Sequence, residues 1–120
     1  MDQRDILTNA AKIEYTISQI SEKADRIEEA TEEKATCLAN YEREIAVTIL
    51  KLKNGAIMEF EGQPIKSLAA NLIPIVAKGI CYKESFDKEM AEGNYKGLIT
   101  IIEALKAQLN GYQSLNKTMQ

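Results

Sequence analysis

The residues that could carry out acid–base, redox or metal chemistry are few in this chain of 120 residues. It contains no histidine, so a serine or cysteine nucleophile would lack its commonest general base. Cys37 and Cys81 match no metal-ligand spacing, and we expect both to be small, mostly buried thiols without a disulfide or redox role. No phosphate-binding loop, dinucleotide-binding glycine turn or calcium-binding loop occurs in the sequence. We therefore predict that the protein is not an enzyme and holds no cofactor or metal ion.

Two pairs of glutamates have the spacing at which helical side chains can act together. Glu28 and Glu32, like Glu29 and Glu33, are four residues apart, which places each pair on one side of a helix. The carboxylate metal sites of helical bundles also require Glu-x-x-His pairs, and these cannot form without histidine. We interpret the four glutamates as a solvated acidic band and as a candidate surface for a partner protein.

Lysines and tyrosines near the C-terminal end could contact nucleic acid. When a protein binds a single strand, aromatic side chains stack on bases and lysines follow the phosphates. Tyr112, by contrast, falls in an apolar row and is expected to pack in the core. The formal net charge of -3 gives no basic footprint for duplex DNA. The candidate nucleic-acid contacts are Tyr95, Lys96, Lys106 and Lys117.

Two largely apolar rows run through residues 6 to 52, and each repeats every seven residues without a glycine or proline. This pattern is typical of a coiled-coil seam. Because so long a helix cannot bury its own stripe, a partner helix must come from the same chain, from further copies, or from both. The rows are Ala10, Ile17, Ala24, Thr31, Leu38, Ile45 and Leu52, and Ile6, Ile13, Ile20, Ile27, Lys34, Tyr41 and Thr48.

Two short stretches leave alternatives open. Thr31 and Lys34 are polar seam positions, which either fix the helix register or mark a solvated zone where helices separate. The four nearby glutamates favour the solvated zone, because they would be costly to bury. Gly93 and Gly97 share a helix face, which either admits a close approach of the first helix or loosens the second helix locally.

The first helix and a tip account for the N-terminal half. We expect helix one from about residue 3 to residue 53, ended by the left-handed cap Asn54-Gly55. Residues 56–66 alternate apolar and polar side chains and turn at residues 62–64, which indicates a short hairpin tip. Since an isolated ribbon is barely stable, its apolar residues must pack on helix ends or on another subunit. These residues, a candidate partner surface, are Ile57, Phe60 and Ile65.

A second helix completes the predicted fold. Ser67 is expected to cap a short helix through residue 73, and helix two follows over about 74–117. Pro74 suits either the first turn of helix two or a kink between the two helices. We predict one all-α domain, residues 1–120, in which two long helices form an antiparallel coiled-coil hairpin with a short β-like or irregular tip. Chain reversal near residue 63 sets Ile20 level with Leu105. One hairpin buries only one seam, so we expect a dimer or tetramer that forms a helical bundle. The seam residues are Ile6, Ile13, Ile17, Ile20, Ile27, Leu38, Tyr41, Ile45, Leu98, Ile101, Ile102, Leu105 and Leu109.

A set of short motifs lies in the C-terminal half of the chain. It consists of Ala77-Lys78-Gly79, Cys81, Lys83, Ala91-Glu92, Tyr95-Lys96, Leu105-Lys106, Leu109-Asn110 and Gln113-Ser114-Leu115. With these motifs the C-terminal half resembles short helical proteins encoded by phages and prophages, which are often encoded beside recombination or single-strand-annealing functions and have no assigned activity. The resemblance covers about a third of the chain and implies a viral or prophage origin, action in the cytoplasm of a bacterial host, and no catalytic residues.

A long patterned surface without chemistry favours a non-catalytic interaction protein that acts on a host protein or defence complex. One alternative is an accessory to phage recombination that binds single-stranded nucleic acid, and another is an oligomer that sequesters a small ligand between its subunits. The N-terminal residues show no basic flank followed by an uninterrupted apolar stretch. We therefore expect neither a signal peptide nor a membrane span, and a cytoplasmic location.

Overall fold

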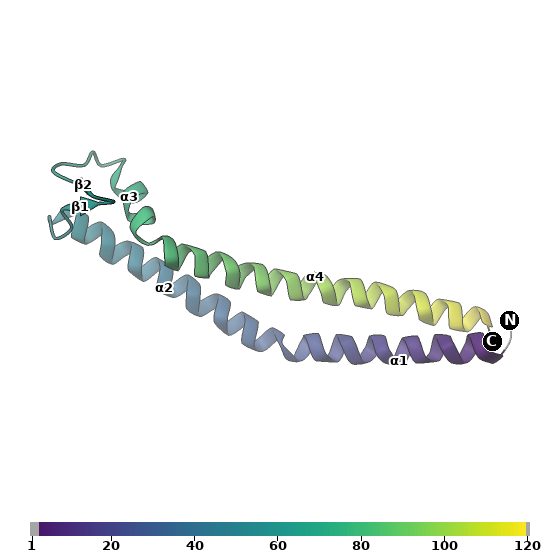
Figure 1. Cartoon of the computed structure of the whole chain (residues 1–120). Helices are drawn as coiled ribbons and strands as arrows, with labels where there is room; N and C mark the ends of the chain where they lie inside the picture. Colours follow the sequence, from purple (N-terminus) through teal and green to yellow (C-terminus); the bar gives the residue numbers. More distant parts are fainter. Residues whose placement is uncertain (1–2, 120) are drawn as a thin grey trace. The chain divides into compact units, whose positions relative to one another are not determined.

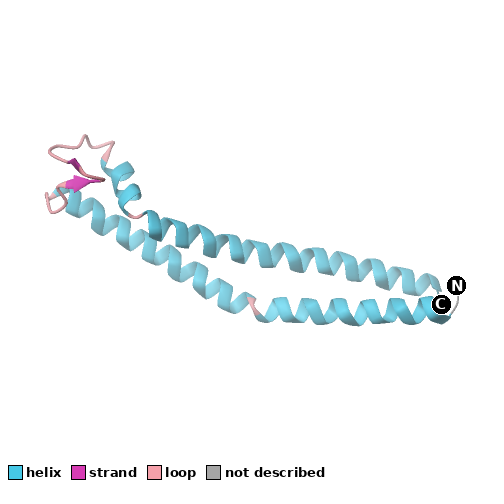
Figure 2. Cartoon of the chain, in the orientation of Figure 1, coloured by secondary structure: helices cyan, strands magenta, loops and turns pink. Residues whose placement is uncertain are grey.

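The computed structural model describes residues 3–119, and most of these residues are helical (Figures 1 and 2), which confirms the predicted all-α class. The described chain divides into two compact units. Unit 1 consists of Met1–Thr31 and Gly93–Gln120, and unit 2 consists of Glu32–Glu92. The elements are α1 (Gln3–Asp25), α2 (Ile27–Lys53), β1 (Glu59–Phe60), β2 (Gln63–Pro64), α3 (Ile73–Ile80) and α4 (Tyr82–Met119).

In unit 1, α1 and the C-terminal part of α4 lie side by side in opposite directions (Figure 1). Asn9 near the start of α1 bonds to Tyr112 and Asn116 near the end of α4. These contacts place the start of α1 beside the end of α4. The pairing of Ile20 with Leu105 stays a prediction. The predicted row that begins at Ile6 faces inward, and its members Ile6, Ile13, Ile20 and Ile27 are half-buried.

The second inward row of α1 differs from the one that we expected. Asn9 and Thr16 are buried and Lys23 is half-buried, whereas the apolar row of Ala10, Ile17 and Ala24 stays exposed in the single chain. The buried polar groups tolerate this position because they are hydrogen-bonded. The inner face of α1 therefore alternates isoleucine with polar side chains, and an apolar row is left outside.

The first helix is interrupted at Arg26, where one continuous helix was predicted. The Arg26 amide donates to the Lys23 carbonyl at 3.1 Å, three residues back, and the Ala30 amide donates to the Arg26 carbonyl at 3.1 Å, four residues back. The break is thus a single tightened turn. Neither glycine nor proline lies there, so the sequence carries no signal for it.

In unit 2, the end of α2 packs against α3 and the first turns of α4. Apolar residues buried here are Leu52, Ala77, Cys81 and Ala91. The buried Thr48 hydroxyl lies 3.3 Å from Cys81 Sγ. These side chains form the small core from which the tip projects.

The tip is the β-like hairpin that we predicted, with its turn one residue earlier. Phe60 pairs with Gln63 across an antiparallel ribbon, so the two-residue loop is Glu61-Gly62, with φ of 52° and 76°. Positive φ at both loop residues matches the twist of the flanking strands. Gln63 and Pro64, which were expected in the turn, belong instead to β2.

The segment after the tip is less helical than the sequence suggested. The predicted short helix after Ser67 does not form. The chain is irregular there up to a turn in which the Leu72 amide donates to the Ala69 carbonyl at 2.9 Å. The helix α3 begins at Ile73 with Pro74 in its first turn, and a turn at Cys81 separates it from α4. The predicted cap at Asn54-Gly55 is confirmed, since α2 ends at Lys53 and Gly55 has φ of 79°.

The structure shows what surrounds Gly79, Gly93 and Gly97. A Cβ added to Gly79 would lie 2.8 Å from Cζ of Phe60, so the absence of a side chain lets the tip close onto α3. The helix α4 runs unbroken through Gly93 and Gly97, and a Cβ at either would meet nothing within 4 Å. Neither a close approach nor a local break therefore explains Gly93 and Gly97.

We expect Ile20→Asp to unfold unit 1 or lower its stability by about 3 kcal/mol, because a charge would enter the inner row without a partner. Thermal unfolding followed by circular dichroism measures the effect. Ser18→Asp is the control, because Ser18 is exposed on the same helix and its substitution should leave the melting temperature nearly unchanged. Equal melting temperatures for both variants would contradict the inward position of Ile20.

Candidate functional site

The described residues carry an unusual number of exposed large apolar side chains. Thirteen such residues have exposed fractions between 41% and 73%. Single exposed apolar residues need no explanation, but groups of them mark interaction surfaces. Eight of the thirteen lie in unit 2: Leu38, Leu50, Met58, Leu72, Ile75, Tyr82, Phe86 and Met90.

Three of these residues form a strip along the start of α4. Tyr82, Phe86 and Met90 follow one another at four-residue steps, which places them on one side of the helix. Their exposed fractions are 73%, 62% and 50%. We call them the apolar strip. Tyrosine, phenylalanine and methionine are residue types enriched in the buried centres of protein interfaces.

The apolar strip adjoins a hollow of about 400 Å³ at the tip. Tyr82 belongs to both the strip and the hollow, and the exposed Glu59 and Glu61 supply two acidic side chains at its edge. The hollow thus combines an apolar floor with negative charge. Its remaining lining residues are Ile57, Phe60, Gly79 and Ile80.

The predicted partner surfaces lie partly where we expected them. All four glutamates of the acidic band, Glu28, Glu29, Glu32 and Glu33, are exposed. The tip residues Ile57, Phe60 and Ile65 are half-buried, and the Phe60 ring lies against Gly79.

The most exposed apolar residues of this region were not singled out from the sequence. They are Tyr82, Met58, Leu50 and Ile75, followed by Phe86 and Met90 of the apolar strip. The four-residue spacing of Tyr82, Phe86 and Met90 was the available signal. The sequence did not predict this strip, because its residues lie outside the seven-residue rows.

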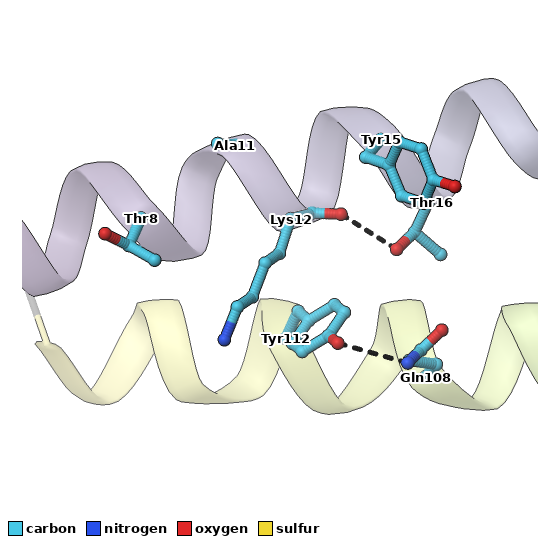
Figure 3. Close-up of a pocket in the computed structure, with 7 residues that line it drawn as sticks. All are labelled: Thr8, Ala11, Lys12, Tyr15, Thr16, Gln108 and Tyr112. Carbon is cyan, nitrogen blue, oxygen red and sulfur yellow. Dashed lines mark hydrogen bonds between the residues drawn. The ribbon is translucent and has the colours of Figure 1, made fainter.

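Unit 1 contains a groove between α1 and α4, shown in Figure 3. It holds about 330 Å³, and a hollow of about 290 Å³ shares some of its residues. Lys12 reaches toward α4, with its ammonium nitrogen 5.8 Å from the centroid of the Tyr112 ring. Gln108 Nε2 donates to the Tyr112 hydroxyl at 3.1 Å. Both contacts fix Tyr112 as a half-buried packing residue.

Polar groups also join the two helices inside unit 1. Asn9 Nδ2 donates to the Tyr112 carbonyl at 2.9 Å and lies 3.5 Å from Asn116 Oδ1. The Thr16 hydroxyl donates to the Lys12 carbonyl of its own helix at 2.8 Å. A buried asparagine bonded across two helices favours one register over its neighbours, because a shifted register would leave the amide without its partners.

The predicted seam residues fall into two groups. Leu98 is buried, and nine others are half-buried. Ile17, Leu38 and Ile101 are exposed in the single chain, at 48%, 41% and 45%. The half-buried group is Ile6, Ile13, Ile20, Ile27, Tyr41, Ile45, Ile102, Leu105 and Leu109.

The predicted nucleic-acid contacts all lie on α4 but differ in exposure. Lys96, Lys106 and Lys117 are exposed on α4, whereas Tyr95 is half-buried. The Tyr95 side chain is therefore less exposed than those of the three lysines.

The two polar seam positions differ in burial. Lys34 is half-buried, whereas Thr31 is exposed and its hydroxyl donates to the Ile27 carbonyl of its own helix.

Within residues 3–119, no three His, Cys, Asp or Glu side chains are placed to hold a metal ion together. Over the same residues, no helix has both the length and the apolar character needed to cross a bilayer.

No family model, curated protein or solved structure matches this chain at a significant level. Functional inference therefore depends on the surfaces described above.

We expect the two thiols to differ in reactivity. Cys37 is half-buried, whereas Cys81 is only 3% exposed, so a thiol reagent should modify Cys37 well before Cys81 in the folded protein. Timed labelling followed by peptide mass spectrometry measures both rates, and denaturant provides the reference state in which both react. Faster labelling of Cys81 would contradict the packing of α3 and α4 on α2.

Proposed function

We propose that this protein is a non-catalytic interaction protein that binds another protein through the apolar strip and the adjoining tip hollow of unit 2. The observation that carries the proposal is the exposure of Tyr82, Phe86 and Met90 on one side of α4. Burying apolar surface contributes about 25 cal/mol per Å². A partner that covers three large side chains therefore gains considerable binding energy.

The hollow indicates the kind of segment that would fit. Its apolar floor suits aliphatic or aromatic side chains, and the exposed Glu59 and Glu61 favour basic residues beside them. A strip at four-residue steps is suited to an amphipathic helix laid along α4. We therefore propose an amphipathic segment with basic flanks as the bound element.

The biological setting is also part of the proposal. The resemblance to short phage and prophage proteins supports a bacterial host protein or defence complex as the partner, met in the host cytoplasm. Self-association into a dimer or tetramer belongs to the same proposal, because apolar residues are exposed in unit 1 as well as in unit 2. The acidic band offers a second, purely electrostatic contact surface.

We expect Phe86→Glu to abolish partner binding without unfolding the protein, because the charge would be desolvated in the complex but not in the free chain. Affinity purification from a bacterial host, with quantitative mass spectrometry of wild type and variant, should show proteins lost with Phe86→Glu.

Leu50→Glu is the matched control for Phe86→Glu. Leu50 is 64% exposed and Phe86 is 62% exposed, so both variants place the same charge at a similarly exposed apolar site of unit 2. Proteins retained by Leu50→Glu and lost with Phe86→Glu support the strip. An identical set of captured proteins for wild type and both variants would exclude the strip as a binding surface.

A second candidate function is binding of single-stranded nucleic acid. The observation in its favour is that the exposed Lys106 and Lys117 are eleven residues apart on α4, about three helical turns, and so lie on one side. Phosphates could follow such a row.

Fluorescence anisotropy with a labelled single-stranded oligonucleotide tests this candidate. We expect any binding to weaken steeply with salt and to fall in the double variant Lys106→Gln, Lys117→Gln. The double variant Lys51→Gln, Lys53→Gln removes the same charge from exposed lysines of unit 2 and should bind as wild type. An unchanged anisotropy at low salt rules the candidate out.

A further inference from the structure

Unit 1 has two faces on either side of its inner rows. One face holds the groove of Figure 3, to which α1 contributes Thr8, Lys12 and Tyr15 and α4 contributes Gln108. At about 100° per residue, the row that contains Ile17 lies on the other side of the inner rows of α1. We call the side opposite the groove the rear face.

The rear face of α1 is an apolar row that the two-helix packing leaves uncovered. Ala10, Ile17 and Ala24 recur every seven residues and are all exposed. Each of the three directly follows a buried or half-buried polar residue of the inner row, so the row flanks the inner face. Such a flanking row is apolar when a helix packs against more than one neighbour. A helix with only one neighbour would carry polar residues there.

The surface area of the chain points in the same direction. A globular monomer of this mass, 13.4 kDa, exposes about 6,500 Å². This chain exposes 8675 Å², which is roughly a third more. A standard interface removes about 800 Å² from each partner. The excess, which is shared by both units, is larger than the area that one such interface removes.

Charge complementarity favours a second copy as the occupant of the rear face. The rim of this face carries Glu14 of α1 and Glu28 at the start of α2, whereas the rear side of α4 carries Lys106 and Lys117, and all four are exposed. Two copies related by a two-fold axis can place the acidic helix of each against the basic end of α4 of the other.

We infer that unit 1 forms a two-fold homodimer through its rear face, in which Ile17 lies at the centre and the lysines of α4 pair with the glutamates of the opposite copy. The apolar stems of the lysines cover the alanine positions while their ammonium groups reach the rim. The groove then stays on the outside of a four-helix arrangement. This inference deepens the self-association in the proposed function and rests on it, but it uses a different surface from the apolar strip.

Analytical ultracentrifugation of Ile17→Glu and Ile101→Glu tests the inference. The two isoleucines are 48% and 45% exposed, and Ile101 lies on the groove side of α4, so the substitutions differ in face but hardly in exposure. We expect wild type and Ile101→Glu to sediment as dimers. Ile17→Glu should raise the dimer dissociation constant about 30-fold or more, with the helical circular dichroism of all three proteins alike.

A second matched pair tests the charge pairing. Lys106→Glu reverses a charge on the rear face, and Lys12→Glu reverses one on the groove face. We expect the first to weaken the dimer and the second to leave its dissociation constant within about twofold, since exposed charges away from an interface contribute little. Raising the salt concentration should weaken the wild-type dimer and reduce the difference between the two variants.

Three results would overturn the inference: a wild-type monomer at every concentration, dissociation by Ile101→Glu but not by Ile17→Glu, or equal effects of both. These outcomes are separable from a failure of the strip proposal, because Phe86→Glu alters unit 2 only. A monomer that still loses its captured proteins with Phe86→Glu would exclude this dimer and retain the strip as a binding surface.

Discussion

The polar residues of the inner rows constrain the rest of this molecule. A helix pair of this kind is stabilised mainly by apolar side chains between the helices, yet Asn9, Thr16 and Thr48 occupy buried places in this chain. Each is satisfied by a hydrogen bond, Asn9 to a carbonyl of the opposite helix, Thr16 to its own helix and Thr48 with a thiol. No buried side-chain nitrogen or oxygen among the described residues lacks a partner. The hydrogen bonds thus offset the cost of removing these three polar side chains from water. Apolar side chains, however, cannot be buried at the same three positions.

Polar residues occupy inner positions of this chain, and large apolar residues are exposed on its surface. Among the described residues, only five apolar side chains are buried, so the hydrophobic contribution of the single chain is small. Large residues that would fill the core of a compact domain lie outside, Phe86 in unit 2 and Ile17 in unit 1 among them. The proposed interaction role and the proposed self-association both rest on this distribution, and each concerns a different unit.

The sequence was informative where a pattern spans many residues. The seven-residue row from Ile6 and the cap at Gly55 predicted the inward face and the end of α2 correctly, because periodicity and positive φ leave clear marks in a sequence. The same reading did not indicate which of two neighbouring rows joins the Ile6 row inside. The Asn9 amide bonds to a carbonyl of the opposite helix, which depends on a tertiary contact, whereas the Thr16 hydroxyl is satisfied within its own helix.

Local breaks were the least predictable features. The tightened turn at Arg26 and the turn at Cys81 involve residues with ordinary helix propensity, so propensity alone favours continuity. The exposed strip was missed for a related reason: steps of four from Tyr82 to Met90 resemble any helical surface until the neighbouring helix is seen to lie elsewhere. Packing therefore supplied what local pattern could not.

The start of α3 has a consequence for local unfolding. Its first turn has no side-chain cap, and the chain before it from residue 65 to residue 69 is irregular, so opening this short helix sacrifices few hydrogen bonds. Its amides should consequently exchange with solvent deuterium sooner than those in the middle of α4. Because the Phe60 ring lies against Gly79 of the same helix, such an opening would also remove a packing contact of the ribbon and change the lining of the hollow at the tip.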